Sequence, residues 1–166
     1  MELRKGLVTK MLVIGWAVCS WSCASDDDYR PIHIYGTWQH LSQDVSEELL
    51  STQIIHFNTD HTYRIVWYFH KPESDEIVGY AAAVSGKFTV LGGELYLLDG
   101  TYYAARGNRY VPFDQLQPAE DGIYRFKYTL RMADGGNELT LISNPCNLEL
   151  GFGCYVHEQT FQRRTR

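Results

Sequence analysis

The stretch Tyr124–Met132, which reads YRFKYTLRM, alternates apolar and polar residues without interruption. Successive side chains of a β-strand point to opposite faces, so this pattern places one row in a core and the other in solvent. The turn-forming residues DGGN follow at positions 134–137 and lead into a second apolar run, Glu138–Ile142. These two segments predict an antiparallel hairpin and set the fold class as β.

The rest of the chain repeats this arrangement of short alternating runs between turn residues. Gly92-Gly93 predicts a hairpin turn with positive φ, and Ser85-Gly86 predicts a bulge within a long extended segment. One short helix is expected near residues 43–50. Eight short antiparallel strands predict either an up-and-down barrel or a sandwich. The expected strands are residues 34–41, 53–57, 63–70, 77–91, 94–98, 124–132, 138–142 and 155–162.

Residues 99–122 predict a long loop, because they are rich in glycine and proline. The segment also carries Tyr102, Tyr103, Tyr110 and Phe113. These rings could contact a partner or cover one end of a barrel, since exposed aromatic residues are common binding anchors. Alternatively, they pack the loop against the fold.

The first residues of the chain have the composition of a secretory signal. Basic residues precede a short apolar run at positions 11–18, and the small residue Ser22 precedes Cys23. A cysteine at that place resembles the lipobox of bacterial lipoproteins, in which the thiol is lipidated. The following acidic triplet Asp26-Asp27-Asp28 resembles the surface-export signal of one Gram-negative lineage. The alternative is an ordinary cleaved signal with an acidic tail.

The lipobox resemblance divides the chain into a signal peptide at residues 1–22, an acidic tether at 23–33 and a domain at 34–166. It implies a lipid anchor on Cys23 in the outer membrane, with the protein exposed at the cell surface of a Gram-negative bacterium. Without residues 1–22, which hold three basic residues and one acidic residue, the chain has 12 basic and 19 acidic residues and a formal charge of −7. This balance argues against binding to nucleic acid.

Two cysteines remain when Cys19 leaves with the signal and Cys23 takes lipid. Cys146 and Cys154 flank a loop with two glycines, and in an oxidising compartment such a pair usually forms a disulfide. Two free thiols are the alternative, and a metal site is disfavoured because no second pair exists.

Four motifs together resemble the lipocalin-like domains of small bacterial lipoproteins. Gly36-Thr37-Trp38 resembles the G-x-W signature, and residues 57–63 (FNTDHTY) resemble an F-x-x-D-G-T-Y hairpin in which His61 replaces glycine. Residues 86–97 resemble the next hairpin, and the last strands end on the expected arginine, Arg163. The resemblance covers residues 34–164 and implies an eight-stranded barrel, closed at one end by packing of Arg163 on Trp38.

A barrel of eight strands can either be filled by side chains or hold one small ligand. The resemblance implies a site for an apolar or amphipathic molecule, with tyrosine hydroxyls as polar contacts. In a filled barrel the same rings would touch one another. The large inward candidates are Trp67, Phe69, Phe88, Phe126, Tyr128 and Met132.

The sequence contains no recognisable catalytic motif, and we expect neither an enzyme nor a cofactor. His56, Asp60 and His61 lack a third histidine at metal-ligand spacing, so no metal site is expected. The sequence thus favours a monomeric, surface-anchored lipoprotein that binds a small ligand. The alternative is a filled barrel that binds a protein or glycan through its loops, especially residues 99–122.

Overall fold

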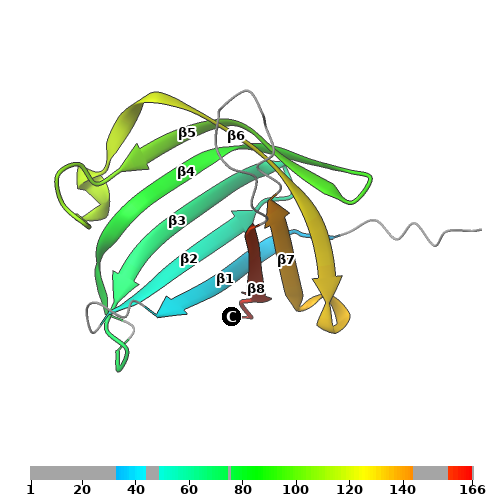
Figure 1. The fold of residues 1–166 in the computed structure, drawn as a ribbon, viewed down its shortest axis with the longest axis horizontal. Coiled ribbons are helices and arrows are strands. Elements are labelled where there is room, and N and C mark those ends of the chain that lie inside the picture. Colours follow the sequence, from blue (N-terminus) through cyan, green and yellow to red (C-terminus); the bar gives the residue numbers. More distant parts are fainter. Residues whose placement is uncertain (1–32, 44–48, 75, 144–156, 166) are drawn as a thin grey trace, which may run out of the picture. The chain divides into compact units, whose positions relative to one another are not determined.

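The computed structural model describes residues 33–43, 49–74, 76–143 and 157–165. Eight antiparallel strands close into one barrel, and each strand pairs with its neighbours in chain order (Figure 1). This arrangement confirms the predicted all-β, up-and-down barrel and excludes the sandwich. The strands are β1 (Gly36–Gln43), β2 (Leu50–Phe57), β3 (Thr62–His70), β4 (Ile77–Leu91), β5 (Glu94–Ala104), β6 (Gln117–Ala133), β7 (Glu138–Ser143) and β8 (His157–Arg163).

The β4–β5 hairpin has the turn and the bulge that its glycines predict. Gly92 and Gly93 adopt φ values of 59° and 78°, a region that only glycine enters without steric cost. The register between β4 and β5 shifts between Ser85 and Lys87. At Gly86 an added Cβ would lie 2.6 Å from the Leu98 carbonyl oxygen, so a side chain there would clash with the backbone.

The turn between β2 and β3 is built by Asp60 and His61. The backbone N–H and the hydroxyl of Thr62 donate to Asp60 Oδ1 at 3.0 and 2.6 Å, and these bonds lower the pKa of the Asp60 carboxyl. His61 adopts φ 62°, a left-handed conformation that favours glycine. Its ring packs edge-on against Tyr35 and at a tilt against Phe88, with centroid distances of 6.1 and 5.6 Å.

One end of the barrel is filled by apolar side chains. We call it the plugged end; it contains the turns at residues 58–61, 92–93 and 134–137. The fully buried Trp38 donates its indole N–H to the Ile34 carbonyl at 2.6 Å. The buried cluster comprises Ile34, Trp38, Ile55, Phe57, Tyr63, Ile65, Val84, Phe88, Leu95, Leu97, Leu130, Leu139, Leu141 and Phe161.

Arg163 closes the plugged end over Trp38, in the contact that the family resemblance implies. Its guanidinium carbon lies 4.3 Å from the centre of the Trp38 ring. The same group donates to three backbone carbonyls: Nε to Gly136 at 2.9 Å, Nη1 to Tyr35 at 2.9 Å and Nη2 to His33 at 3.3 Å. Within the described residues β1 and β8 pair only at Trp38–Arg163 and Gln39–Gln162, so this side chain supplements a short ladder.

Two sequence-based assignments need correction or lie beyond what is described. The predicted loop at 99–122 is wrong: β5 continues to Ala104 and β6 begins at Gln117, which leaves a connection of residues 105–116. For the predicted helix near 43–50, Gln43 ends β1 and Leu50 begins β2, while 44–48 lie outside the described residues.

The anchoring residue Cys23 and the pair Cys146 and Cys154 also fall outside the described residues. Among the residues that are described, no helix has the length and apolar character needed to cross a membrane.

Candidate functional site

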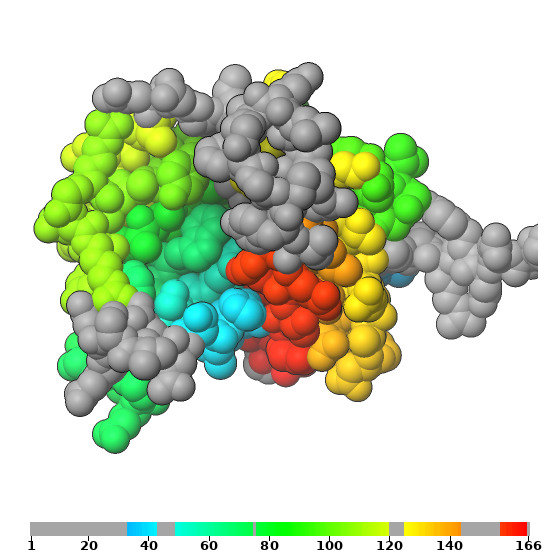
Figure 2. All heavy atoms as spheres, in the orientation of Figure 1, coloured from blue at the N-terminus to red at the C-terminus, as the bar shows by residue number. Residues whose placement is uncertain are grey.

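The end of the barrel opposite the plugged end is the one at which β1, β3, β5 and β7 end and β2, β4, β6 and β8 begin. We call it the mouth. Figure 2 shows a hollow on this side of the molecule, with a floor of teal and green atoms from β2, β3 and β4. A ligand in this hollow would contact the side chains that face inward near the mouth.

Strand register identifies those side chains, because directly paired residues of antiparallel strands share one face of a sheet. Phe126 pairs with Leu97 and Tyr128 pairs with Leu95, and both leucines lie in the buried core. Trp67 follows the buried Ile65 by two residues on β3 and so points the same way. All three aromatic rings thus face the barrel interior, as the sequence predicts.

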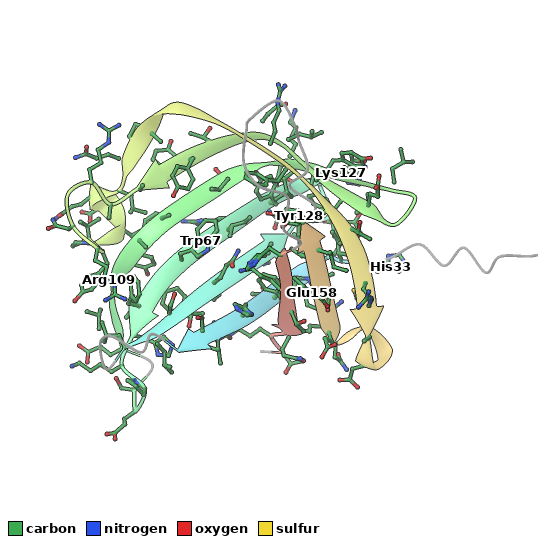
Figure 3. All side chains as sticks on the ribbon, in the orientation of Figure 1. His33, Trp67, Arg109, Lys127, Tyr128 and Glu158 are labelled. Atoms are coloured by element: carbon green, nitrogen blue, oxygen red, sulfur yellow. The ribbon has the colours of Figure 1, made fainter. Side chains whose placement is uncertain are left out.

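These three rings are nevertheless not fully covered by protein. Phe126 is 46% exposed although its partner Leu97 is 1% exposed, and Trp67 and Tyr128 are half-buried. Phe126 and Tyr128 stack with their centroids 6.0 Å apart and their planes 18° apart. In Figure 3 Trp67 lies on the concave face of the strands, within the hollow. The interior is filled at the plugged end and leaves an aromatic surface toward the mouth.

The other three predicted ligand contacts, Phe88, Met132 and Phe69, pack within the barrel to different extents. Phe88 belongs to the plugged end, where its ring meets Phe57 at 4.9 Å. Met132 is half-buried, pairs with Leu139 and packs against the core. Phe69 is inward and buried at the rim of the mouth. The structure therefore leaves Trp67, Phe126 and Tyr128 facing inward and partly exposed, and it buries Phe88 at the plugged end.

The connection at residues 105–116 folds back onto the start of β4. Val111 and Tyr80 exchange two backbone hydrogen bonds of 2.8 and 3.0 Å, which form an isolated antiparallel bridge. Tyr110 packs on Phe69 at 5.5 Å and occupies the space beside Gly79, where an added Cβ would lie 2.5 Å from Tyr110 Cδ2. This connection forms one wall of the mouth.

The rim and outer surface of this wall carry two cation–π contacts. Arg109 covers Phe69, with its guanidinium carbon 4.8 Å from the ring centre, and Figure 3 places Arg109 at the edge of the hollow. On the outside, Phe113 contacts Tyr80 at 5.1 Å and lies under Arg64 at 4.8 Å. Tyr110 and Phe113 thus pack the connection against the barrel.

Tyr102 and Tyr103 belong to β5 instead of a loop. Tyr102 pairs with the buried Val84 and faces inward, half-buried against the core. Tyr103 pairs with Ala83, so it faces the outside of the barrel and is exposed. Only Tyr102 is therefore placed to contribute to the interior surface.

Tyr63 lies on the same face of β3 as the buried Ile65, but no sequence signal marks its hydroxyl as unusual. Its hydroxyl is the one buried side-chain polar atom without a hydrogen-bond partner among the residues that the structure describes. Burial is the main cause that raises the pKa of this phenol, and the nearby Tyr128 and Asp99 contribute. The alternation on β3 predicts the direction of the side chain, whereas the missing partner is visible only in three dimensions.

A second concavity lies at the seam between β1 and β8. It is a groove of about 590 Å³, lined by Gln39, His40, Leu41, Thr160, Gln162, Arg163, Arg164 and Thr165. His40 Nδ1 lies 2.8 Å from the Thr160 carbonyl oxygen across this seam. The histidine contact joins the two strands just beyond their last paired residues.

The described residues hold no cluster of three potential metal-ligating side chains. Of the two histidines near the first hairpin, His56 Nδ1 is 2.8 Å from the Thr37 hydroxyl, and His61 packs on aromatic rings. Comparison of the sequence with models of protein families and with curated proteins gave no match.

Proposed function

We propose that this chain is a lipid-anchored surface protein whose barrel binds a small apolar or amphipathic molecule. The observation that carries the proposal is the aromatic surface of Trp67, Phe126 and Tyr128, which faces inward yet stays partly exposed. Apolar surface in a concave site gains about 25 cal/mol for each Å² that a ligand removes from water. Binding would proceed by burial of the ligand, without chemical conversion.

The anchoring part of the proposal rests on the sequence around Cys23. Lipidation of this cysteine would hold the barrel at the outer membrane, on the cell surface of a Gram-negative bacterium, through the acidic tether. Replacing Cys23 with Ser should abolish incorporation of radiolabelled lipid and move the protein out of the membrane fraction. Unchanged membrane attachment would refute the anchor.

The interaction-module alternative has less support. It needs aromatic side chains that are presented to a partner. Tyr103 is exposed on the outer face, but Tyr110 packs on Phe69 and Phe113 packs on Tyr80. Phe113 is still 40% exposed, so it supplies a matched control for the ligand site. Phe113 and Phe126 are exposed to a similar extent, yet only Phe126 faces the interior.

The test is binding of N-phenylnaphthylamine, a neutral fluorescent probe that brightens in apolar sites. Phe126→Ser should weaken probe binding about tenfold, because it removes an apolar wall. Phe113→Ser should leave the affinity unchanged. Equal effects of the two variants would show that the probe does not bind in the interior. Native mass spectrometry of protein purified from its own host would then identify a co-purifying molecule.

A further inference from the structure

The Tyr63 hydroxyl is a buried hydrogen-bonding group that has no partner among the described residues. The residue is 1% exposed, and within the part of the chain that the structure describes its oxygen is buried without a hydrogen-bond partner. Folding removes the hydroxyl from water, and no protein hydrogen bond replaces the ones that it loses. Buried side-chain polar atoms in native proteins usually have a partner, so this exception calls for one.

The hydroxyl lies on the side of the interior that leads to the aromatic surface. Tyr63 pairs with the buried Phe57 on β2 and with Gly86 on β4, so its ring points inward. Gly86 presents no side chain beside the ring. Tyr128 on β6 packs against the buried cluster that contains Tyr63, and it contributes to the raised pKa of the Tyr63 phenol. Tyr128 in turn stacks on the half-exposed Phe126.

The chemistry of the phenol restricts what could be its partner. Burial and the neighbouring Tyr128 and Asp99 favour the neutral form, so the group stays protonated and acts as a hydrogen-bond donor. A ligand that satisfies it must present a hydrogen-bond acceptor, and the common neutral acceptors are the oxygens of a ketone, ester, ether or alcohol. A hydrocarbon would leave the hydroxyl unpaired.

We propose that the Tyr63 hydroxyl donates a hydrogen bond to an acceptor oxygen of the bound molecule. The apolar part of that molecule lies against Trp67 and Phe126, and the Tyr128 ring turns to admit its polar end. This inference rests on the proposed ligand-binding function and adds the ligand class: a neutral amphipathic molecule with an oxygen acceptor at its inner end.

The experiment compares two fluorescent probes on the wild-type protein and on Tyr63→Phe, which removes the hydroxyl alone. Prodan carries a ketone acceptor, and N-phenylnaphthylamine carries no acceptor oxygen. Loss of one hydrogen bond should weaken prodan binding about five- to tenfold and leave the other probe within about twofold. Bound prodan should also emit at shorter wavelength in the variant. Tyr96→Phe is the matched control, because Tyr96 faces outward and its hydroxyl donates to Glu94 at 2.6 Å.

Each outcome has a separate meaning. If neither probe binds the wild-type protein, the proposed function fails and the inference fails with it. If both probes bind and the variant affects neither, or weakens both equally, only the Tyr63 inference is overturned. A second measurement compares the infrared stretch of the isotope-labelled prodan carbonyl bound to the wild-type protein and to Tyr63→Phe: the band should lie at lower frequency in the wild type, and equal frequencies would contradict the hydrogen bond.

Discussion

His61 combines an unfavourable backbone conformation with favourable ring contacts. A residue with a side chain at φ 62° loses about 1–2 kcal/mol relative to glycine, whereas the contacts with Tyr35 and Phe88 each contribute about 0.5–1.5 kcal/mol. His61→Ala keeps the strain and loses the contacts, so it should destabilise the protein by about 1–2 kcal/mol. His61→Gly removes both the backbone strain and the ring contacts, so it should be about 1 kcal/mol more stable than His61→Ala.

Urea unfolding of the purified proteins measures this order directly. An alanine variant that is as stable as the glycine variant would show that the turn is not strained.

Single residues also show how far the sequence can be read. The motif resemblance predicted the contact of Arg163 with Trp38, and alternation predicted that Trp67 and Tyr128 face inward. Neither pattern could predict how much of each ring stays exposed. That quantity depends on where neighbouring strands diverge at the mouth, which is a property of the whole barrel.

At the scale of elements, the connection at residues 105–116 depends on a missing side chain in β4. Gly79→Ala places a methyl group on Tyr110, so the ring must move away from Phe69. We expect a loss of about 1–3 kcal/mol and faster tryptic cleavage at Arg106 and Arg109. Pairing Gly79→Ala with Tyr110→Ala should cost less than the sum of the two single changes. Strict additivity would show that the two residues are not coupled.

Arg163 is the side chain that secures β8 against β1. Arg163→Ala removes a ring contact and three hydrogen bonds to carbonyls, and should destabilise the half-buried site by about 3 kcal/mol. Arg164→Ala is the control, because the exposed Arg164 contacts Thr37 through its backbone N–H, and it should change stability by less than about 0.5 kcal/mol. Thermal unfolding of both variants measures the two changes in stability. Similar losses of stability would contradict the role of Arg163 in holding β8 against β1.

The boundaries of β5 and β6 show where local signals fail at the element scale. Glycines and prolines within 99–122 predict a loop, yet Tyr103 pairs with Pro118 and Ala104 with Gln117. The β5–β6 ladder accommodates the turn-forming residues by shifting its register between Leu97 and Gly100 and between Thr101 and Tyr103. Pairing across the barrel therefore overrides the local preference, which no short window of sequence can indicate.

For the molecule as a whole, Tyr63 links stability to alkaline pH. Its pKa is raised above the ordinary value of 10.0, so above pH 10 the unfolded chain releases this proton while the folded protein retains it. Stability should therefore fall as pH rises, by up to about 1.4 kcal/mol per pH unit from this group alone. Denaturant unfolding of Tyr63→Phe should lack this part of the decline. Parallel pH profiles of the two proteins would show that Tyr63 ionises equally in both states.

The short β1–β8 ladder also has a consequence for how the barrel forms. Its two residue pairs join positions 38–39 to positions 162–163, the most distant pairing in the barrel. Contacts of such long sequence separation carry the largest loop-closure cost and belong to the slow steps of folding. Until β8 is in place, β1 and β7 present unpaired edges that can recruit other chains. A nascent polypeptide that stops short of Arg163 would thus be an aggregation-prone open sheet, and pairing of the last strand closes it into a barrel.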